Sequence, residues 1–160
     1  MCGRCQALII AIGDYNDVSD IAGAVDNGRD WVSWLSKSQR LRGTNIQMLF
    51  DDRATKENIE DAAHLIGDRA KSGERVWLVF IGHGAPSKDG QEGLLLGLEP
   101  TGQGPSLESG LGICGIISWV LGCCALNHTL DNLVSLWVSF VPFCHPPTPT
   151  VLPSLICPLA

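Results

Sequence analysis

The sequence predicts an α/β fold with a mainly parallel sheet covered by helices on both faces. Three apolar runs, at residues 7–12, 45–50 and 76–81, have the length and composition of buried strands. Two segments with helical spacing of apolar residues separate these runs. The order strand, helix, strand, helix, strand favours right-handed crossovers and a parallel sheet.

Each helical segment has a candidate cap and a candidate buried face. We expect Ser19 or Asp20 to cap the first helix, and Thr55 to cap the second. Trp31 and Trp34 border the buried stripe of the first helix and are expected to cover the core. That stripe is predicted to comprise Ile21, Val25, Gly28, Val32 and Leu35. The buried face of the second helix is predicted to comprise Ile59, Ala63, Ile66 and Ala70.

Charge divides the 160 residues into two parts. All 11 Lys and Arg lie at or before Lys88, and Asp131 is the only charged residue beyond Glu108. We therefore expect an α/β domain at residues 1–102 and an apolar, proline-rich tail of uncertain origin at residues 103–160. The net charge of −6 argues against nucleic acid and against an anionic membrane surface as partners. The amino terminus lacks the features of a signal peptide, which predicts a cytoplasmic chain.

The tail allows three interpretations. Residues 111–126 are uncharged but short for a membrane span, and no Lys or Arg flanks them. The tail is a divergent fourth strand and end of the domain, a membrane-associated segment, or sequence foreign to the fold, such as a frameshift product. We favour the third, because charged residues stop abruptly near the start of this tail.

Neither the cysteines nor the paired acids predict a metal site or any other cofactor. Cys2 and Cys5 form a single CxxC without a second ligand pair, which predicts two free thiols. Asp51 and Asp52 are expected to lie in a solvated loop.

His83 is the strongest candidate for chemistry. It stands between Gly82 and Gly84, directly after the third strand. Loops at the carboxyl ends of parallel strands line the sites of open α/β sheets. Residues 14–17, 51–52 and 82–84 are therefore expected along one edge. The chain has no G-x-G-x-x-G after its first strand and no P-loop motif, which disfavours a nucleotide-binding domain.

Four segments between about residues 6 and 100 carry a family resemblance. They read ALIIAIGDYND, IAGAVDNGRDWVSWL, NIQMLFDDRATKENIEDA and VWLVFIGHGAPSKDGQEGLLLG. Together they resemble the first part of a caspase-like cysteine peptidase domain, closer to bacterial caspase-like and metacaspase-like members than to animal caspases. The resemblance implies a caspase-like three-layer sandwich that is incomplete after the third or fourth strand. It also implies a protein or peptide substrate.

The resemblance assigns roles to four residues. His83 would be the catalytic imidazole, and the Gly84 N–H would belong to the oxyanion hole. Metacaspases read a basic residue before the cut with the Asp of a G-C-x-N-D element. Asp26 and Asn27 occupy the matching positions with acid and amide exchanged. They are the candidate substrate-binding residues, without a predicted preference for Arg or Lys.

The resemblance does not identify the nucleophilic cysteine. The family's Asp-x-Cys-x-x-Gly motif, which follows a fourth strand, does not occur here. Cys114, Cys123, Cys124 and Cys144 are the candidates, and Cys124 is the best if residues 116–121 form that strand. Cys124 follows His83 by 41 positions, against about 50 between the two catalytic residues of caspases. We thus expect either a cysteine endopeptidase with a Cys–His dyad of His83 and Cys124, or a catalytically silent binding or scaffold fragment. A chain truncated before the nucleophile would be inactive.

Overall fold

The computed structural model describes residues 5–16, 18–71, 74–86, 93–98, 110–112, 115–116 and 134–139. The longer elements are β1 (Gln6–Ala11), α1 (Ala24–Ser38), β2 (Ile46–Phe50), α2 (Lys56–Arg69), β3 (Val76–Ile81) and β7 (Val134–Ser139). The short elements are η1 (Gly43–Asn45), η2 (Asp51–Arg53), β4 (Gly84–Pro86), β5 (Gly93–Leu95) and β6 (Leu111–Gly112).

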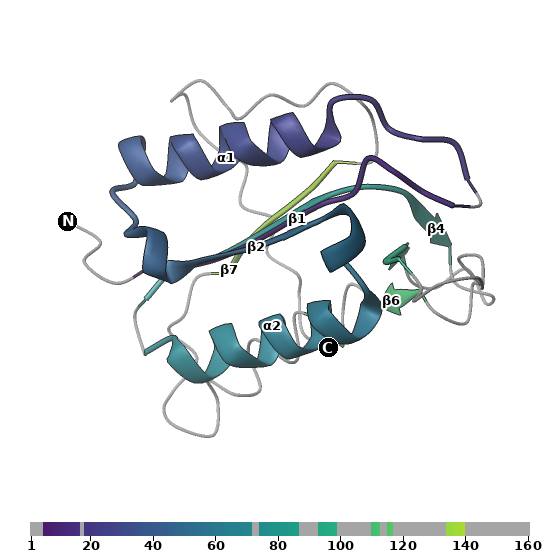
Figure 1. The fold of residues 1–160 in the computed structure, drawn as a ribbon. Coiled ribbons are helices and arrows are strands. Elements are labelled where there is room, and N and C mark those ends of the chain that lie inside the picture. The colour runs from purple at the N-terminus through teal and green to yellow at the C-terminus, as the bar shows by residue number, and fades with distance from the viewer. Residues whose placement is uncertain are drawn as a thin grey trace.

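A parallel sheet lies between two helices. Its strand order is β2-β1-β3-β7, and all three neighbouring pairs are parallel. Figure 1 shows α1 on one face of this sheet and α2 on the other. The predicted α/β class and the helix–sheet–helix layering are confirmed.

The sheet separates two hydrophobic cores, because successive side chains of a strand point to opposite faces. Leu8 and Ile10 of β1 belong to the core beneath α2, whereas Ala7, Ile9 and Ala11 belong to the core beneath α1. Every residue of β1 and β3 is buried, as the continuous apolar runs predict for central strands.

α1 begins later than the sequence predicts. Its N-cap is Gly23 in the left-handed conformation (φ 78°), not Ser19 or Asp20. The Asp20 carboxylate instead accepts a hydrogen bond from the Tyr15 N–H (3.1 Å), so it is not available to the helix. The buried stripe is also different, since Val25 and Val32 are only partly buried. It consists of Ala24, Gly28, Trp31 and Leu35.

α2 follows the prediction closely. Thr55 is its N-cap, and the Thr55 hydroxyl accepts a hydrogen bond from the Asn58 N–H (3.3 Å). Of the expected face, Ile59, Ala63 and Ile66 are buried, and Ala70 packs against the same core from the C-cap position. The prediction holds here because the Thr55 cap and the spacing of apolar residues indicate the same start of the helix.

The strand beside β3 comes from a part of the tail that the sequence did not indicate. β7 pairs with β3 in parallel, with Ile81 opposite Ser139. Gly115 and Ile116 are helical, so no strand begins at 116, and residues 117–121 lie outside the described ranges. The strand described beside β3 is β7, and the predicted strand at residues 116–121 is not found at Ile116 and stays a prediction for the rest.

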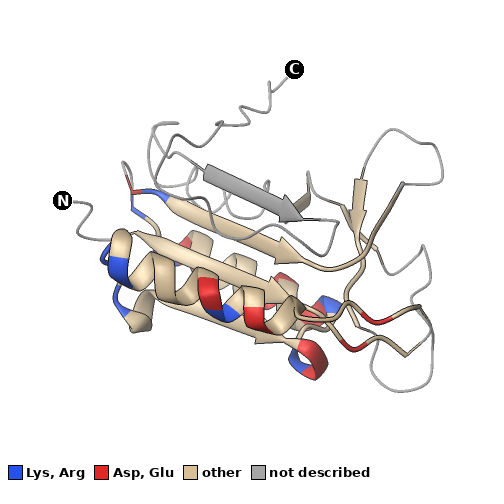
Figure 2. Cartoon of the chain, turned by 90° about the horizontal axis from the view of Figure 1, so that it is seen from above, with Lys and Arg blue, Asp and Glu red and all other residues tan. Residues whose placement is uncertain are grey.

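Acidic residues gather where the strands of the large sheet end. In Figure 2 red segments mark the loops at the arrowheads of the strands and η2, and blue segments dominate the opposite end. Among the described residues, the acids of these loops are Asp14, Asp20, Asp51 and Asp52. This edge therefore favours cationic groups over anionic ones.

Cys5 departs from the expectation of a free thiol. It is buried in the core beneath α1 and is disulfide-bonded to a cysteine outside the described residues. Among the helices of the described ranges, none has the length and apolar character needed to cross a membrane.

Candidate active site

His83 lies two residues after the end of β3, at the carboxyl edge of the large sheet. The loop after β1 runs beside it, and the loop after β2 is tied to the β1 loop by hydrogen bonds. The three loops expected to share one edge do so. This edge is the candidate active site.

The His83 imidazole is held by a backbone carbonyl. Its Nε2 lies 2.7 Å from the Ser19 oxygen. A carbonyl oxygen only accepts hydrogen bonds, so Nε2 carries the proton and donates it to Ser19. The neutral ring then has its lone pair on Nδ1, which is the nitrogen able to take a proton from a nucleophile. Ser19 was not among the residues expected at the site, because a backbone acceptor leaves no mark in the sequence.

Tyr15 contacts His83 at both its backbone and its ring. The Tyr15 hydroxyl accepts a hydrogen bond from the His83 N–H (2.9 Å), and the two rings are in tilted contact with centroids 4.8 Å apart. The side chain is 5% exposed. Burial is the main reason why the Tyr15 pKa rises from 10.0 to about 12, and the Asp51 charge adds to the rise. The hydrogen bond from His83 acts in the opposite direction.

This raised pKa predicts a loss of stability at alkaline pH. Above pH 10 the unfolded chain ionises its tyrosine while the folded chain keeps the proton, so unfolding becomes easier up to about pH 12. We expect a loss of about 2 kcal/mol across this range. Tyr15 is the only tyrosine, so near-ultraviolet tyrosinate absorbance reports its pKa directly, and urea unfolding reports the stability. Tyr15→Phe should lose less stability over the same range. An equal alkaline loss in the variant would contradict the prediction.

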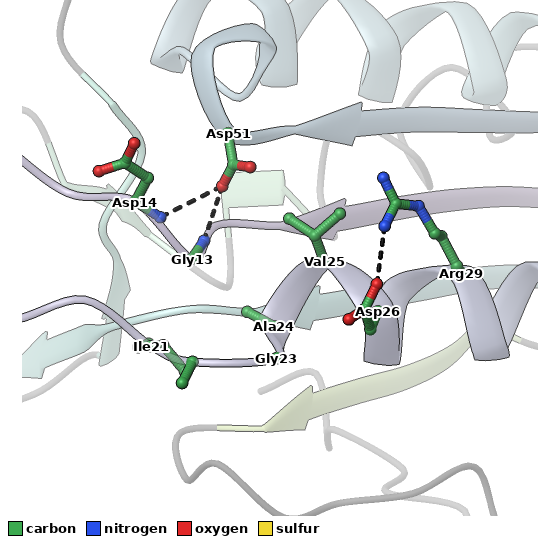
Figure 3. A pocket seen from close by; sticks show the side chains of 10 residues that line it. Gly13, Asp14, Ile21, Gly23, Ala24, Val25, Asp26, Arg29 and Asp51 are labelled. Atoms are coloured by element: carbon green, nitrogen blue, oxygen red, sulfur yellow. Dashed lines mark hydrogen bonds and ion pairs between the residues drawn. The ribbon is translucent and has the colours of Figure 1, made fainter.

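Asp51 ties together two of the loops. Its Oδ1 accepts hydrogen bonds from the Gly13 N–H (2.8 Å) and the Asp14 N–H (3.2 Å), as Figure 3 shows. The Asp51 backbone has φ 43°, a conformation that Asp tolerates better than most residues. Asp51 therefore has a structural role, whereas the sequence predicted only an acid in a solvated loop.

We expect Asp51→Ala to lower the free energy of unfolding by about 2 kcal/mol, because two hydrogen bonds to a carboxylate are lost. Asp51→Asn keeps an acceptor oxygen and should cost less than half as much. Asp52→Ala, which changes an exposed neighbour, is the control and should cost less than about 0.5 kcal/mol. Urea denaturation measures all three. Equal losses for the two alanine variants would disprove the role of Asp51.

Asp26 and Asn27 lie in the first turn of α1. Asp26 forms an exposed ion pair with Arg29 (2.7 Å) and lines an open pocket of about 420 Å³. Figure 3 shows this pocket between the amino end of α1, Gly13–Asp14 and Asp51. Asn27 is half-buried, and neither Asn27 nor His83 lines the pocket. The structure thus places Asp26, but not Asn27, in the lining of this pocket.

Gly84 follows His83 as the first residue of β4, where it is exposed and paired with Leu95. Its role in an oxyanion hole stays a prediction. Cys124, with Cys114, Cys123 and Cys144, lies outside the described residues. Within the part of the chain that the structure describes, no three His, Cys, Asp or Glu side chains are grouped to hold a metal ion.

Comparisons with known proteins find similarity over about half of the chain. No family model matches the chain. Metacaspase-1B of Neurospora crassa is 28% identical over 93 residues, which are 54% of this chain and 22% of that protein. Metacaspase-1A of Aspergillus oryzae is 28% identical over 98 residues, 56% of this chain and 23% of that protein. The chain spans less than a quarter of the length of these relatives, and its similarity to them supports a caspase-like domain.

A solved structure is similar in fold. The Geobacter sulfurreducens protein GSU0716 superposes with a TM-score of 0.59 at 13% identity, covering 84% of this chain and 48% of that one. The curated relatives above are fungal and this structural neighbour is bacterial. A closer relation to bacterial members stays a prediction.

Proposed function

We propose that this chain carries the histidine half of a caspase-like cysteine endopeptidase site. The observation that carries the proposal is the His83 imidazole at the end of β3, with Nε2 bound to the Ser19 carbonyl and Nδ1 left as the acceptor. A neutral imidazole fixed in this tautomer is suited to take a proton from a thiol. The similarity to metacaspases supports the same reaction class.

The proposed chemistry has four steps. Nδ1 takes the thiol proton, and the thiolate attacks the peptide carbonyl carbon. Backbone N–H groups, with Gly84 as a candidate, stabilise the oxyanion. The imidazolium returns its proton to the leaving amine, which leaves a thioester. Water then hydrolyses the thioester with His83 as the base.

Two thiols are the candidates for the nucleophile. Cys124 is the choice from the sequence. The order of the sheet adds Cys144, because β7 lies beside β3, runs parallel to it, and is followed by Cys144 five positions after Ser139. The acidic loops at this edge support substrates with a basic residue near the cut, as does the pocket, which three acids line against the single base Arg29.

Peptide hydrolysis tests the proposal. The full chain is assayed with fluorogenic peptides ending in Arg, Lys or Asp, beside His83→Ala, Cys124→Ser and Cys144→Ser. We expect His83→Ala to lower kcat/KM by about 10²–10⁴-fold, and one of the two cysteine variants to abolish turnover. His64→Ala, an exposed histidine on α2, should be unchanged. Undiminished hydrolysis in His83→Ala would refute the proposal.

The second candidate function is a catalytically silent caspase-like binding or scaffold module. It is favoured by the absence of an Asp-x-Cys-x-x-Gly motif anywhere in the sequence. The same assay separates the two candidates. Turnover that disappears in His83→Ala excludes the silent module, and a wild-type chain that hydrolyses none of the peptides supports it.

A further inference from the structure

At the start of the β4–β5 hairpin, the Tyr15 hydroxyl takes the place of one direct backbone hydrogen bond between His83 and Leu96. Gly84 pairs with Leu95, which places His83 opposite Leu96. The Leu96 N–H donates to the His83 oxygen (3.0 Å), the first of the two bonds that an antiparallel hydrogen-bonded pair exchanges. The return bond runs through a side chain: the His83 N–H donates to the Tyr15 hydroxyl (2.9 Å), which donates to the Leu96 oxygen (3.3 Å).

The space for this hydroxyl is created by Gly82. A Cβ at Gly82 would lie 2.6 Å from the Tyr15 hydroxyl oxygen, so any side chain there would displace it. The first glycine of the Gly-His-Gly sequence is thereby explained by a residue of the β1 loop.

The same β1 loop also holds the His83 ring. The Tyr15 ring contacts the imidazole, and Ser19, four positions further on, accepts the hydrogen bond from Nε2. The Tyr15 N–H is bound by the Asp20 carboxylate (3.1 Å), which closes the loop on itself. His83 is thus contacted at its backbone, its ring face and its ring nitrogen by one short segment.

We propose that Tyr15 is a positioning residue for His83: its hydroxyl, inserted between the His83 N–H and the Leu96 carbonyl, sets the backbone so that Nε2 meets the Ser19 oxygen. The catalytic consequence rests on the proposed function, whereas the structural one does not. The Tyr15 hydroxyl keeps its proton and remains a donor to Leu96 at neutral pH, and its pKa of about 12 extends this to alkaline pH.

The test compares Tyr15→Phe with the wild-type chain by ¹⁵N NMR of the histidine ring nitrogens. Phenylalanine keeps the ring contact and removes only the inserted oxygen. We expect the wild-type His83 to show a protonated Nε2 and an unprotonated Nδ1, and Tyr15→Phe to show a mixture of both tautomers. Thr55→Ala removes a hydroxyl hydrogen bond at the α2 cap and should leave the tautomer unchanged. An unchanged tautomer in Tyr15→Phe would overturn the proposal.

A measurement on the wild-type chain decides the matter if Tyr15→Phe does not fold. A hydroxyl buried between two backbone partners exchanges slowly enough to give a proton signal with a nuclear Overhauser effect to the His83 amide. Two results would overturn the proposal. One is a slowly exchanging hydroxyl signal that shows no Overhauser effect to the His83 amide, and the other is the absence of any slowly exchanging hydroxyl signal.

Activity gives an independent readout. If the wild-type chain hydrolyses peptides, Tyr15→Phe should lower kcat about tenfold or more with KM changed less than about twofold, because the imidazole is misplaced. Unchanged kcat would contradict the inference. A wild-type chain without any turnover refutes the proposed function alone, and the NMR comparison still decides the role of Tyr15.

Discussion

Gly82→Ala should destabilise the domain by about 3 kcal/mol, the upper end of the usual cost of overpacking. The added Cβ would lie 2.6 Å from the Tyr15 hydroxyl oxygen and 2.8 Å from Cζ of Phe80. Neither neighbour has room to move, because Tyr15 and Phe80 are both buried in the core beneath α2. The variant should also lose peptide hydrolysis, since the His83 backbone follows directly.

Gly43→Ala is the matched control for this change. Gly43 lies in η1, and a Cβ there would meet nothing within 4 Å. We expect its free energy of unfolding to stay within about 0.5 kcal/mol of the wild type. Urea denaturation measures both variants. A cost for Gly82→Ala no larger than that for Gly43→Ala would show that the packing around Gly82 is looser than described.

Trp31→Ala should cost about 3–5 kcal/mol, the usual range when a large buried aromatic side chain is truncated. Trp31 is fully buried at the centre of α1, and its ring meets Trp34 edge-to-face at 5.5 Å. Alanine would leave a cavity between α1 and the sheet. Thermal and urea unfolding measure the loss.

Trp34→Ala provides the comparison on the same helix. Trp34 is only partly buried, although it also contacts Trp77 edge-to-face at 5.5 Å. Part of its surface already faces water, so we expect about half the cost of Trp31→Ala. A larger loss for Trp34→Ala than for Trp31→Ala would reverse the assignment of the central core residue.

The sequence predicted those parts of the fold in which one local pattern decides the structure. β1 and β3 are continuous apolar runs in a sheet covered on both faces, and α2 combines a Thr cap with regular spacing. The start of α1 was missed because Gly23 in the left-handed conformation has no side chain to signal a cap. Asp20 looked like a cap but binds the Tyr15 N–H.

The candidate site was predictable only where the chemistry is carried by side chains. His83 stands out between two glycines, and its place at the sheet edge follows from the strand order. Tyr15 was expected at this edge, but its contact with His83 was not, because the two residues are 68 positions apart along the chain. Ser19 acts through a backbone oxygen, and β7 lies in a largely apolar segment where Ser135 and Ser139 are too few polar residues to define a period.

The small side chains of β1 restrict how this domain can diversify. Ala7 and Ala11 face α1, and a Cβ on Gly28 would lie 2.8 Å from the Ala11 Cβ, so helix and strand are already in contact there. Leu8 and Ile10 occupy the opposite face, toward α2. A one-residue insertion within β1 would exchange these two sets and force large side chains against Gly28. Length changes are therefore confined to the loops, which leaves the carboxyl edge as the place where related chains can acquire new specificities.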